Sequence, residues 1–435
     1  MWFRPNGSMR TARVGERRVS MDFGVAYTEE QQQFRKEVRA WIEENVPEDM
    51  KEPVDGRDDT EEQWRFWLEK HREMAVKGWL YPTYPKEYGG GGLSGDHETI
   101  LAEEFRQARI PWSGSSLLFA TLLVWGTEEQ REKFLVPLLK GEATSWQKLT
   151  EPKGGADLAN YQSRAVRDGD DWLLTGSNVF ISGTPRPHWT PAGPNYLYGP
   201  MLTDPDAPRH RNLGYFIIPV PSEGLDIKEM DLLPGHDQHA IFMDNVRVPA
   251  DHLIGGETQG WQVLGAHLDQ EHGGRGRAAP SPRDAFAAKM VDYARDTKHS
   301  SGTLGSDPVV QQTAMEAIID SHRDAILGKR TYWMYSNRME VQYQGNVADV
   351  HNREHQLRNT IRVRDVMGMY TLLDRNDPRA PQEGAQEVSQ RDKAGQRHAG
   401  GSTNIAKVIL SRRIGISRTQ ERAAPTPSTA TKFGS

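Results

Sequence analysis

The chain has 435 residues, is 36% apolar and exceeds the length of one ordinary hydrophobic core, which predicts two or three packed regions. Its net charge is −6, with 54 basic residues dispersed among 60 acidic ones, and it has no cysteine, which argues against a nucleic-acid partner and excludes disulfides and cysteine-bound metals. No run of about 18 apolar residues is present, so we expect a soluble protein without membrane insertion, cytoplasmic or, in a eukaryote, in the mitochondrial matrix.

Helical signals dominate the first 140 residues. Thr28 and Gln31 form a capping-box pattern, and apolar residues then recur at helical spacing until Pro47. Further helices are predicted over residues 61–77, 96–108 and, from a second capping-box pattern at Thr127 and Gln130, through Leu139.

From about residue 150, short apolar runs alternate with polar residues, which is typical of antiparallel strands. Asp168 and Gly169 form a turn pair between two such runs. The proline-rich run from Gly183 to Pro200 is expected to be a loop or an edge, because proline cannot donate to a central strand ladder. Further strands are predicted over 213–220 and 240–248, and further helices over 261–268, 286–293, 309–333 and 352–367.

Three motifs follow one another along this pattern. They are Thr150-Glu151-Pro152 with Gly154-Gly155-Ala156-Asp157, then Asp244-Asn245-Val246-Arg247-Val248-Pro249, and finally Gly400-Gly401-Ser402-Thr403-Asn404-Ile405. In this order and spacing they resemble the acyl-CoA dehydrogenase family from about residue 21 to 418. The resemblance implies an α+β multidomain fold with an N-terminal helical bundle, a central antiparallel β-barrel or sandwich and a C-terminal four-helix bundle. The expected regions are a disordered extension at 1–20, helical 21–145, β 146–254, helical 255–418 and a disordered tail at 419–435.

The resemblance also implies that FAD is the cofactor. In the family, the segment at the Thr-Glu-Pro tripeptide places donors against the flavin's pyrimidine edge, where they stabilise the negative charge of the reduced ring. Phe180 falls where the family has an aromatic residue against the flavin; the alternative is an ordinary core-facing strand residue. The last motif contacts FAD across a subunit boundary, which implies a tetramer, homomeric or heteromeric. The implied FAD contacts are Gln147, Leu149, Thr150, Gly155, Ala156, Phe180, Ser182, Lys298, Ser402 and Asn404.

The expected reaction is α,β-dehydrogenation of an acyl-CoA thioester, with electrons leaving to an electron-transferring flavoprotein. Proton removal next to a thioester needs a carboxylate whose pKa is raised by a dry pocket. Many family members carry this Glu just before the last motif, where this chain has Gly400. Other members place it on the helix after the β region, and Glu271 matches that position as the catalytic base. An exposed helical Glu is the alternative.

Several positions depart from the family pattern. The family usually has Ser at the position of Ala156. Its Arg-containing segment, which helps to bind FAD in the neighbouring subunit, is replaced here around residues 297–302, where Lys298 could supply the positive charge. Asp269 and His272 flank the predicted base and are expected to contact substrate; His272 stands where some members have Arg. Gly273 and Gly274 weaken the helix, by about 1 kcal/mol each relative to Ala, which favours a wider pocket. A helix with glycines here resembles the family branches that act on bulky substrates, including steroid side-chain thioesters.

Other functions fit parts of the sequence. His351-Asn352-Arg353-Glu354-His355 matches the H-x-x-E-H zinc-peptidase pattern, which arises often by chance, and His236 and His239 are a second histidine pair. We expect no metal. Related flavoproteins of the same fold oxidise nitroalkanes or hydroxylate aromatics with oxygen. A non-catalytic subunit that holds FAD for a partner chain is a further alternative.

Overall fold

The computed structural model describes residues 27–53, 55–114, 116–155, 157–182, 193–233, 238–273, 285–300, 302–336, 339, 343–395 and 402–417. The side chains of residues 269–273 are outside this description. The predicted extension at 1–20 and tail at 419–435 also lie outside it.

The N-terminal region consists of helices, as predicted. Both predicted capping boxes are confirmed, because the side chains of Thr28 and Thr127 accept from the backbone N–H of Gln31 and Gln130. A π-helical turn links the last two helices. The helices are α1 (Glu29–Asn45), α2 (Glu61–Val76), α3 (Gly95–Gln107), α4 (Leu117–Trp125), α5 (Glu128–Gln130) and α6 (Val136–Leu139).

One mostly antiparallel sheet follows, with strands in the order β6-β7-β3-β2-β4-β5-β8 and β1 paired to β4. The pairs of β1 and β2 with β4 are parallel. The loop between β2 and β3 is Gly169–Asp170, one residue later than the predicted turn pair. The strands are β1 (Thr144–Gln147), β2 (Arg164–Asp168), β3 (Asp171–Ser182), β4 (Asn195–Leu202), β5 (Leu213–Val220), β6 (Leu225–Met230), β7 (Gln238–Pro249) and β8 (Leu253–Ile254).

The prediction of a loop or edge up to Pro200 is wrong for its last part, because β4 is an interior strand. Pro200 pairs with Tyr215 of β5 on one side. On the other side, β1 pairs with β4 only up to Tyr198, and β2 joins only at Leu202. Pro200 therefore lies in a gap of the ladder, where its missing N–H interrupts no strand pairing.

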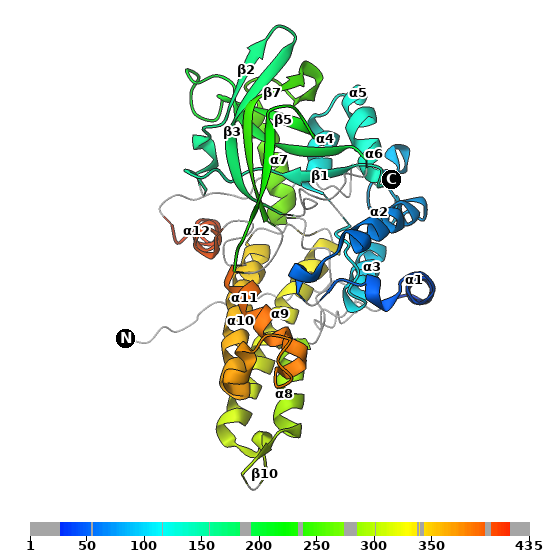
Figure 1. The fold of residues 1–435 in the computed structure, drawn as a ribbon, viewed down its shortest axis with the longest axis vertical. Helices are drawn as coiled ribbons and strands as arrows, with labels where there is room; N and C mark the ends of the chain where they lie inside the picture. Colours follow the sequence, from blue (N-terminus) through cyan, green and yellow to red (C-terminus); the bar gives the residue numbers. More distant parts are fainter. Residues whose placement is uncertain are drawn as a thin grey trace, which may run out of the picture.

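The C-terminal region returns to helices, among which the sequence patterns did not single out α11 and α12. Helix α7 packs against α4, β4 and β5, whereas α9 and α10 form a long pair that extends away from the sheet (Figure 1). The elements are α7 (Gly260–Gly273), α8 (Ala285–Asp296), β9 (Lys298–His299), β10 (Gly302–Thr303), α9 (Pro308–Ser336), α10 (Gln344–Met367), α11 (Ala385–Gly395) and α12 (Thr403–Arg413).

Two apolar cores position the functional segments. One lies inside the β region and contains Trp146, Trp172 and Phe216. The other joins the sheet to the helices, because Tyr215 of β5 packs with Phe119 of α4 and with residues of α7. The segment that follows β1 thus begins where sheet and helices meet.

Candidate functional site

The structure brings together two of the segments predicted to contact the flavin. The carbonyl oxygen of Thr150 accepts a hydrogen bond from the backbone N–H of Val179, at 2.9 Å. The same oxygen accepts from Nδ2 of Asn178, at 3.2 Å. The Leu149–Thr150 backbone is thereby fixed next to the stretch of β3 that carries Phe180 and Ser182.

Glu151, the next residue, has its carboxylate turned into the protein. It accepts from the backbone N–H of Gln162 at 2.7 Å and from both the N–H and the hydroxyl of Ser163 at 2.6 Å. Its backbone also pairs with Gly154 in both directions, at 3.1 Å. Glu151 therefore shapes the turn after Thr150 and leaves no carboxylate facing a ligand.

The Phe180 side chain points out of the sheet, and its backbone has an unusual conformation. Its φ is +61°, in the left-handed region, and it lies at an irregularity between β3 and β7. Its side chain is 51% exposed, which excludes the core-facing alternative. Two residues later, the Ser182 hydroxyl accepts a hydrogen bond from Nε2 of Gln238, at 3.2 Å. Backbone strain of this kind in a non-glycine residue is common where a side chain serves a ligand.

The backbone of the glycine loop after Thr150 has open space beside it. A Cβ atom built on Gly154 or Gly155 would meet no other atom of the described chain within 4 Å. Packing therefore does not require glycine at either position. Close approach of a backbone to a pyrophosphate does favour glycine, so this loop fits FAD. Ala156 lies outside the described residues.

Helix α7, which contains position 271 of the predicted base, packs against the sheet. Leu264 and His267 are fully buried, and His267 Nδ1 shares a hydrogen bond of 2.7 Å with the Tyr215 hydroxyl. The His267 ring also lies 5.7 Å from that of Tyr198, the residue registered with Gln147 of β1. Positions 264, 267 and 271 are spaced by three and four residues and so share one helix face. The Asp269, Glu271 and His272 side chains themselves are outside the description.

Three predicted FAD contacts lie elsewhere in the chain. Lys298 is exposed in β9, which pairs with β10 at the far end of the α8–α9 helices (Figure 1). Ser402 caps α12 by accepting from the Ile405 N–H, at 3.3 Å, and Asn404 is exposed on the same helix. Within one chain, the structure does not bring Lys298 to β1.

The H-x-x-E-H segment is part of the α9–α10 contact. The His351 and His355 rings stack with centroids 5.8 Å apart, and His351 Nδ1 lies 3.4 Å from Asp324 Oδ1. Glu354 faces away to Lys407, at 2.6 Å. His239 is buried in β7, and His236 is not described. The part of the chain that is described contains no group of three metal-ligating side chains, nor any helix long and apolar enough to cross a membrane.

Sequence reasoning missed a buried polar network beneath the segment predicted to contact the flavin. The Lys148 side chain is fully buried, and its Nζ donates to the Pro200 carbonyl at 2.9 Å. The Tyr161 hydroxyl donates to the Lys148 carbonyl at 3.2 Å and accepts from Asn178 Nδ2 at 2.7 Å. The only signal in the sequence is a lysine at an inward-facing position, since Trp146, two residues earlier, lies in the β core.

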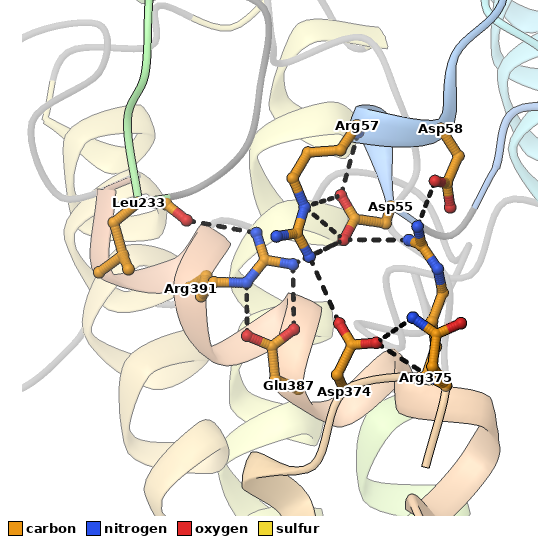
Figure 2. A network of polar contacts seen from close by, with 9 residues as sticks. Asp55, Arg57, Asp58, Leu233, Asp374, Arg375, Glu387 and Arg391 are labelled. Atoms are coloured by element: carbon orange, nitrogen blue, oxygen red, sulfur yellow. Dashed lines mark hydrogen bonds and ion pairs between the residues drawn. The ribbon is translucent and has the colours of Figure 1, made fainter. Parts of the chain in front are cut away.

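An ion cluster that joins distant parts of the chain was missed as well (Figure 2). The Asp55 carboxylate, 1% exposed, accepts from Arg57 Nε at 2.9 Å and from Arg391 Nη2 at 2.7 Å, and Arg375 Nη1 lies 3.3 Å away. Arg391 also donates to the Leu233 carbonyl at 3.2 Å. The cluster connects the loop before α2 to α11 and to the segment that follows β6.

Comparisons with known proteins agree with this architecture. A model of the acyl-CoA dehydrogenase N-terminal domain matches residues 28–142. Acyl-CoA dehydrogenase FadE29 of Mycobacterium tuberculosis is 31% identical over 297 residues, which cover 68% of this chain and 72% of the relative. The Tcur3481-Tcur3483 steroid ACAD has a TM-score of 0.77 at 24% identity, over 91% of this chain and 99% of that one. The ChsE4-ChsE5 complex from Mycobacterium tuberculosis gives 0.75 at 24% identity, over 91% and 100%. These similarities confirm the predicted fold.

Proposed function

Because this chain belongs to the acyl-CoA dehydrogenase family, we propose that it oxidises the Cα–Cβ bond of an acyl-CoA thioester with FAD as hydride acceptor. We further propose Glu271 as the base that removes the α proton, and an electron-transferring flavoprotein as the acceptor of the electrons.

One observation carries the assignment of the base. Position 271 shares a helix face with Leu264 and His267, both fully buried against the sheet. That face packs on β4, and β4 is registered with β1 directly before the Leu149–Thr150 segment. An exposed helical Glu would instead be expected on the opposite face of α7.

The chain's own residues supply binding and proton transfer. Leu149, Thr150, Phe180 and Ser182 would hold the flavin, and Gly155 would lie against its pyrophosphate. FAD, when bound, accepts the hydride that leaves the β carbon. Glu271 takes the α proton, a task for which a carboxylate is a suitable general base.

Anaerobic reduction tests the reaction. The purified protein should show a flavin spectrum, and acyl-CoA thioesters should bleach it without oxygen. A panel from short chains to steroid side-chain thioesters should favour the bulky ones, because the low helix propensity of Gly273 and Gly274 favours a wider pocket. Oxygen-dependent product formation with no anaerobic bleaching would support a monooxygenase, and bleaching by nitroalkanes alone would support a nitroalkane oxidase.

The second candidate is a subunit that holds FAD for a partner chain. It is favoured by Gly400 at the usual place of the base and by a structural neighbour that is a complex of two chains, ChsE4 with ChsE5. Substrate bleaching by the chain purified alone would exclude it. A purified chain that gains flavin and activity only with a homologous second chain would establish it.

An apolar stripe on α9 supports an oligomer. Met315, Ile319 and Ile326 are 54%, 44% and 52% exposed, and their spacing of four and seven residues places them on one face. We assign this stripe to contact with a second copy of the chain. Contact between subunits is also what the predicted roles of Lys298, Ser402 and Asn404 require, because the family positions that they match reach FAD across a subunit boundary.

We therefore predict that Ile319→Lys lowers the oligomer mass in sedimentation velocity and reduces retained FAD, because it buries a charge in an apolar interface. Val309→Lys is the matched control, since Val309 is exposed on α9 away from the stripe. It should leave the mass unchanged. An Ile319→Lys variant with the wild-type mass would contradict the assignment.

A further inference from the structure

A lysine lies in the core of the β region, and no carboxylate of the described residues is at ion-pair distance from it. Lys148 Nζ has two polar neighbours, the Pro200 carbonyl at 2.9 Å and Met201 Sδ at 3.0 Å, and it lies 5.2 Å from the centre of the Tyr161 ring. The hydrogen bond from Lys148 Nζ to the Pro200 carbonyl lies in the gap that β1 and β2 leave beside β4. Burial of an ammonium group costs several kcal/mol, so an apolar residue would fill this space at lower cost.

The buried ammonium lies next to the predicted flavin segment, on the side opposite to the Leu149 side chain. Lys148 precedes Leu149 and Thr150, and side chains alternate along an extended chain, so its own points to the opposite side from that of Leu149. Tyr161 and Asn178 connect its carbonyl to that of Thr150 through buried hydrogen bonds. The lysine is thus coupled to the flavin segment both through the backbone and through this network.

The charge of Lys148 is sensitive to pH near neutrality. Burial lowers the pKa of Lys148 to about 7, and the nearby Glu151 carboxylate opposes this shift only in part. Glu151 is occupied by Ser163 and Gln162, and burial raises the pKa of Tyr161 so that it stays neutral. Among the described residues, Glu151 and Tyr161 are the titratable groups that face this ammonium.

On the premise of the proposed flavin chemistry, we infer that Lys148 is a positioning residue whose buried positive charge favours the reduced state of a flavin held against Leu149 and Thr150. Reduction places negative charge on the flavin's pyrimidine side. A positive charge in a medium of low dielectric stabilises that state far more than one in water.

The test is the two-electron midpoint potential of the FAD-loaded protein with Lys148→Met, measured near pH 6 and near pH 8.5. At pH 6 the variant should lose about tenfold in the equilibrium constant for reduction, which is ~30 mV for a two-electron couple. At pH 8.5, where lysine is neutral, the difference should shrink. Lys148→Gln, which keeps a donor for Pro200 without the charge, should behave like Lys148→Met. Lys228→Met, on the exposed surface of β6, is the control and should change neither value.

The inference would be overturned if wild type and Lys148→Met had equal midpoint potentials. It would also be overturned if their difference were the same at both pH values, because a purely structural effect of the lysine would not depend on its protonation. If neither variant folds, the wild type decides: its oxidised-flavin absorption should shift with an apparent pKa near 7, and a constant spectrum from pH 6 to 8.5 overturns the inference. A wild type that binds no FAD, or that no acyl-CoA bleaches, defeats the proposed function instead. Normal bleaching with no Lys148 effect defeats this inference alone.

Discussion

Replacing Glu271 by glutamine is expected to give a folded protein that binds FAD and acyl-CoA but is bleached about 10²–10⁴-fold more slowly, the usual contribution of a positioned general base. Glutamine has nearly the same shape as glutamate and cannot accept the α proton at neutral pH. The measurement is the stopped-flow rate of flavin bleaching under anaerobic conditions at saturating acyl-CoA.

Glu257→Gln is the matched control. Glu257 lies just before α7 and forms an exposed pair with Arg167, at 3.4 Å. Its removal should leave the bleaching rate at the wild-type value. If Glu271→Gln is bleached as fast as the wild type, the base lies elsewhere, and position 271 has only a packing role on α7.

The parts of the fold that the sequence predicted well depend on local signals. A capping box needs only residues three apart, so the starts of the helices at Thr28 and Thr127 could be predicted from the sequence alone. The β2–β3 hairpin and the helix–β–helix order follow from turn residues and apolar periodicity in the same way. The motif after β1 indicated the position of the loop, whereas its environment depends on the hydrogen bonds from Val179 and Asn178.

The errors and omissions concern contacts between distant segments. Pro200 was assigned to a loop because the sequence does not show where neighbouring strands stop, and β1 and β2 leave the gap in which a proline is tolerated. Lys148 was passed over because its partners come from other elements. Asp55 lies more than 300 residues from Arg375 and Arg391, and the many other acidic residues are equally plausible partners at the level of sequence.

The ion cluster around Asp55 is expected to contribute strongly to the stability of the folded protein. Asp55→Asn should lower the free energy of unfolding by about 3 kcal/mol at pH 7, because it leaves three guanidinium groups around a neutral amide. We place the value at the low end of the range for a broken buried pair, since Arg57 and Arg375 are partly exposed. Urea unfolding followed by tryptophan fluorescence measures the loss.

The pH dependence separates this ionic effect from a packing defect. Burial alone would raise the pKa of Asp55, but hydrogen bonds from Arg57 and the charge of Arg391 outweigh it and hold the pKa well below its ordinary value of 3.8. A depressed folded-state pKa means that the stabilisation is fully present above pH 3.8 and is lost as the pH falls through the folded value. The difference in the free energy of unfolding between wild type and Asp55→Asn should therefore be constant from about pH 8 to pH 5 and become smaller in stronger acid.

The control is Asp226→Asn, which breaks an exposed pair with Lys228 on β6 and should lower the free energy of unfolding by less than about 1 kcal/mol. A gap for Asp55→Asn no larger than this control, or one that persists unchanged in acid, would show that the three arginines do not depend on the Asp55 charge.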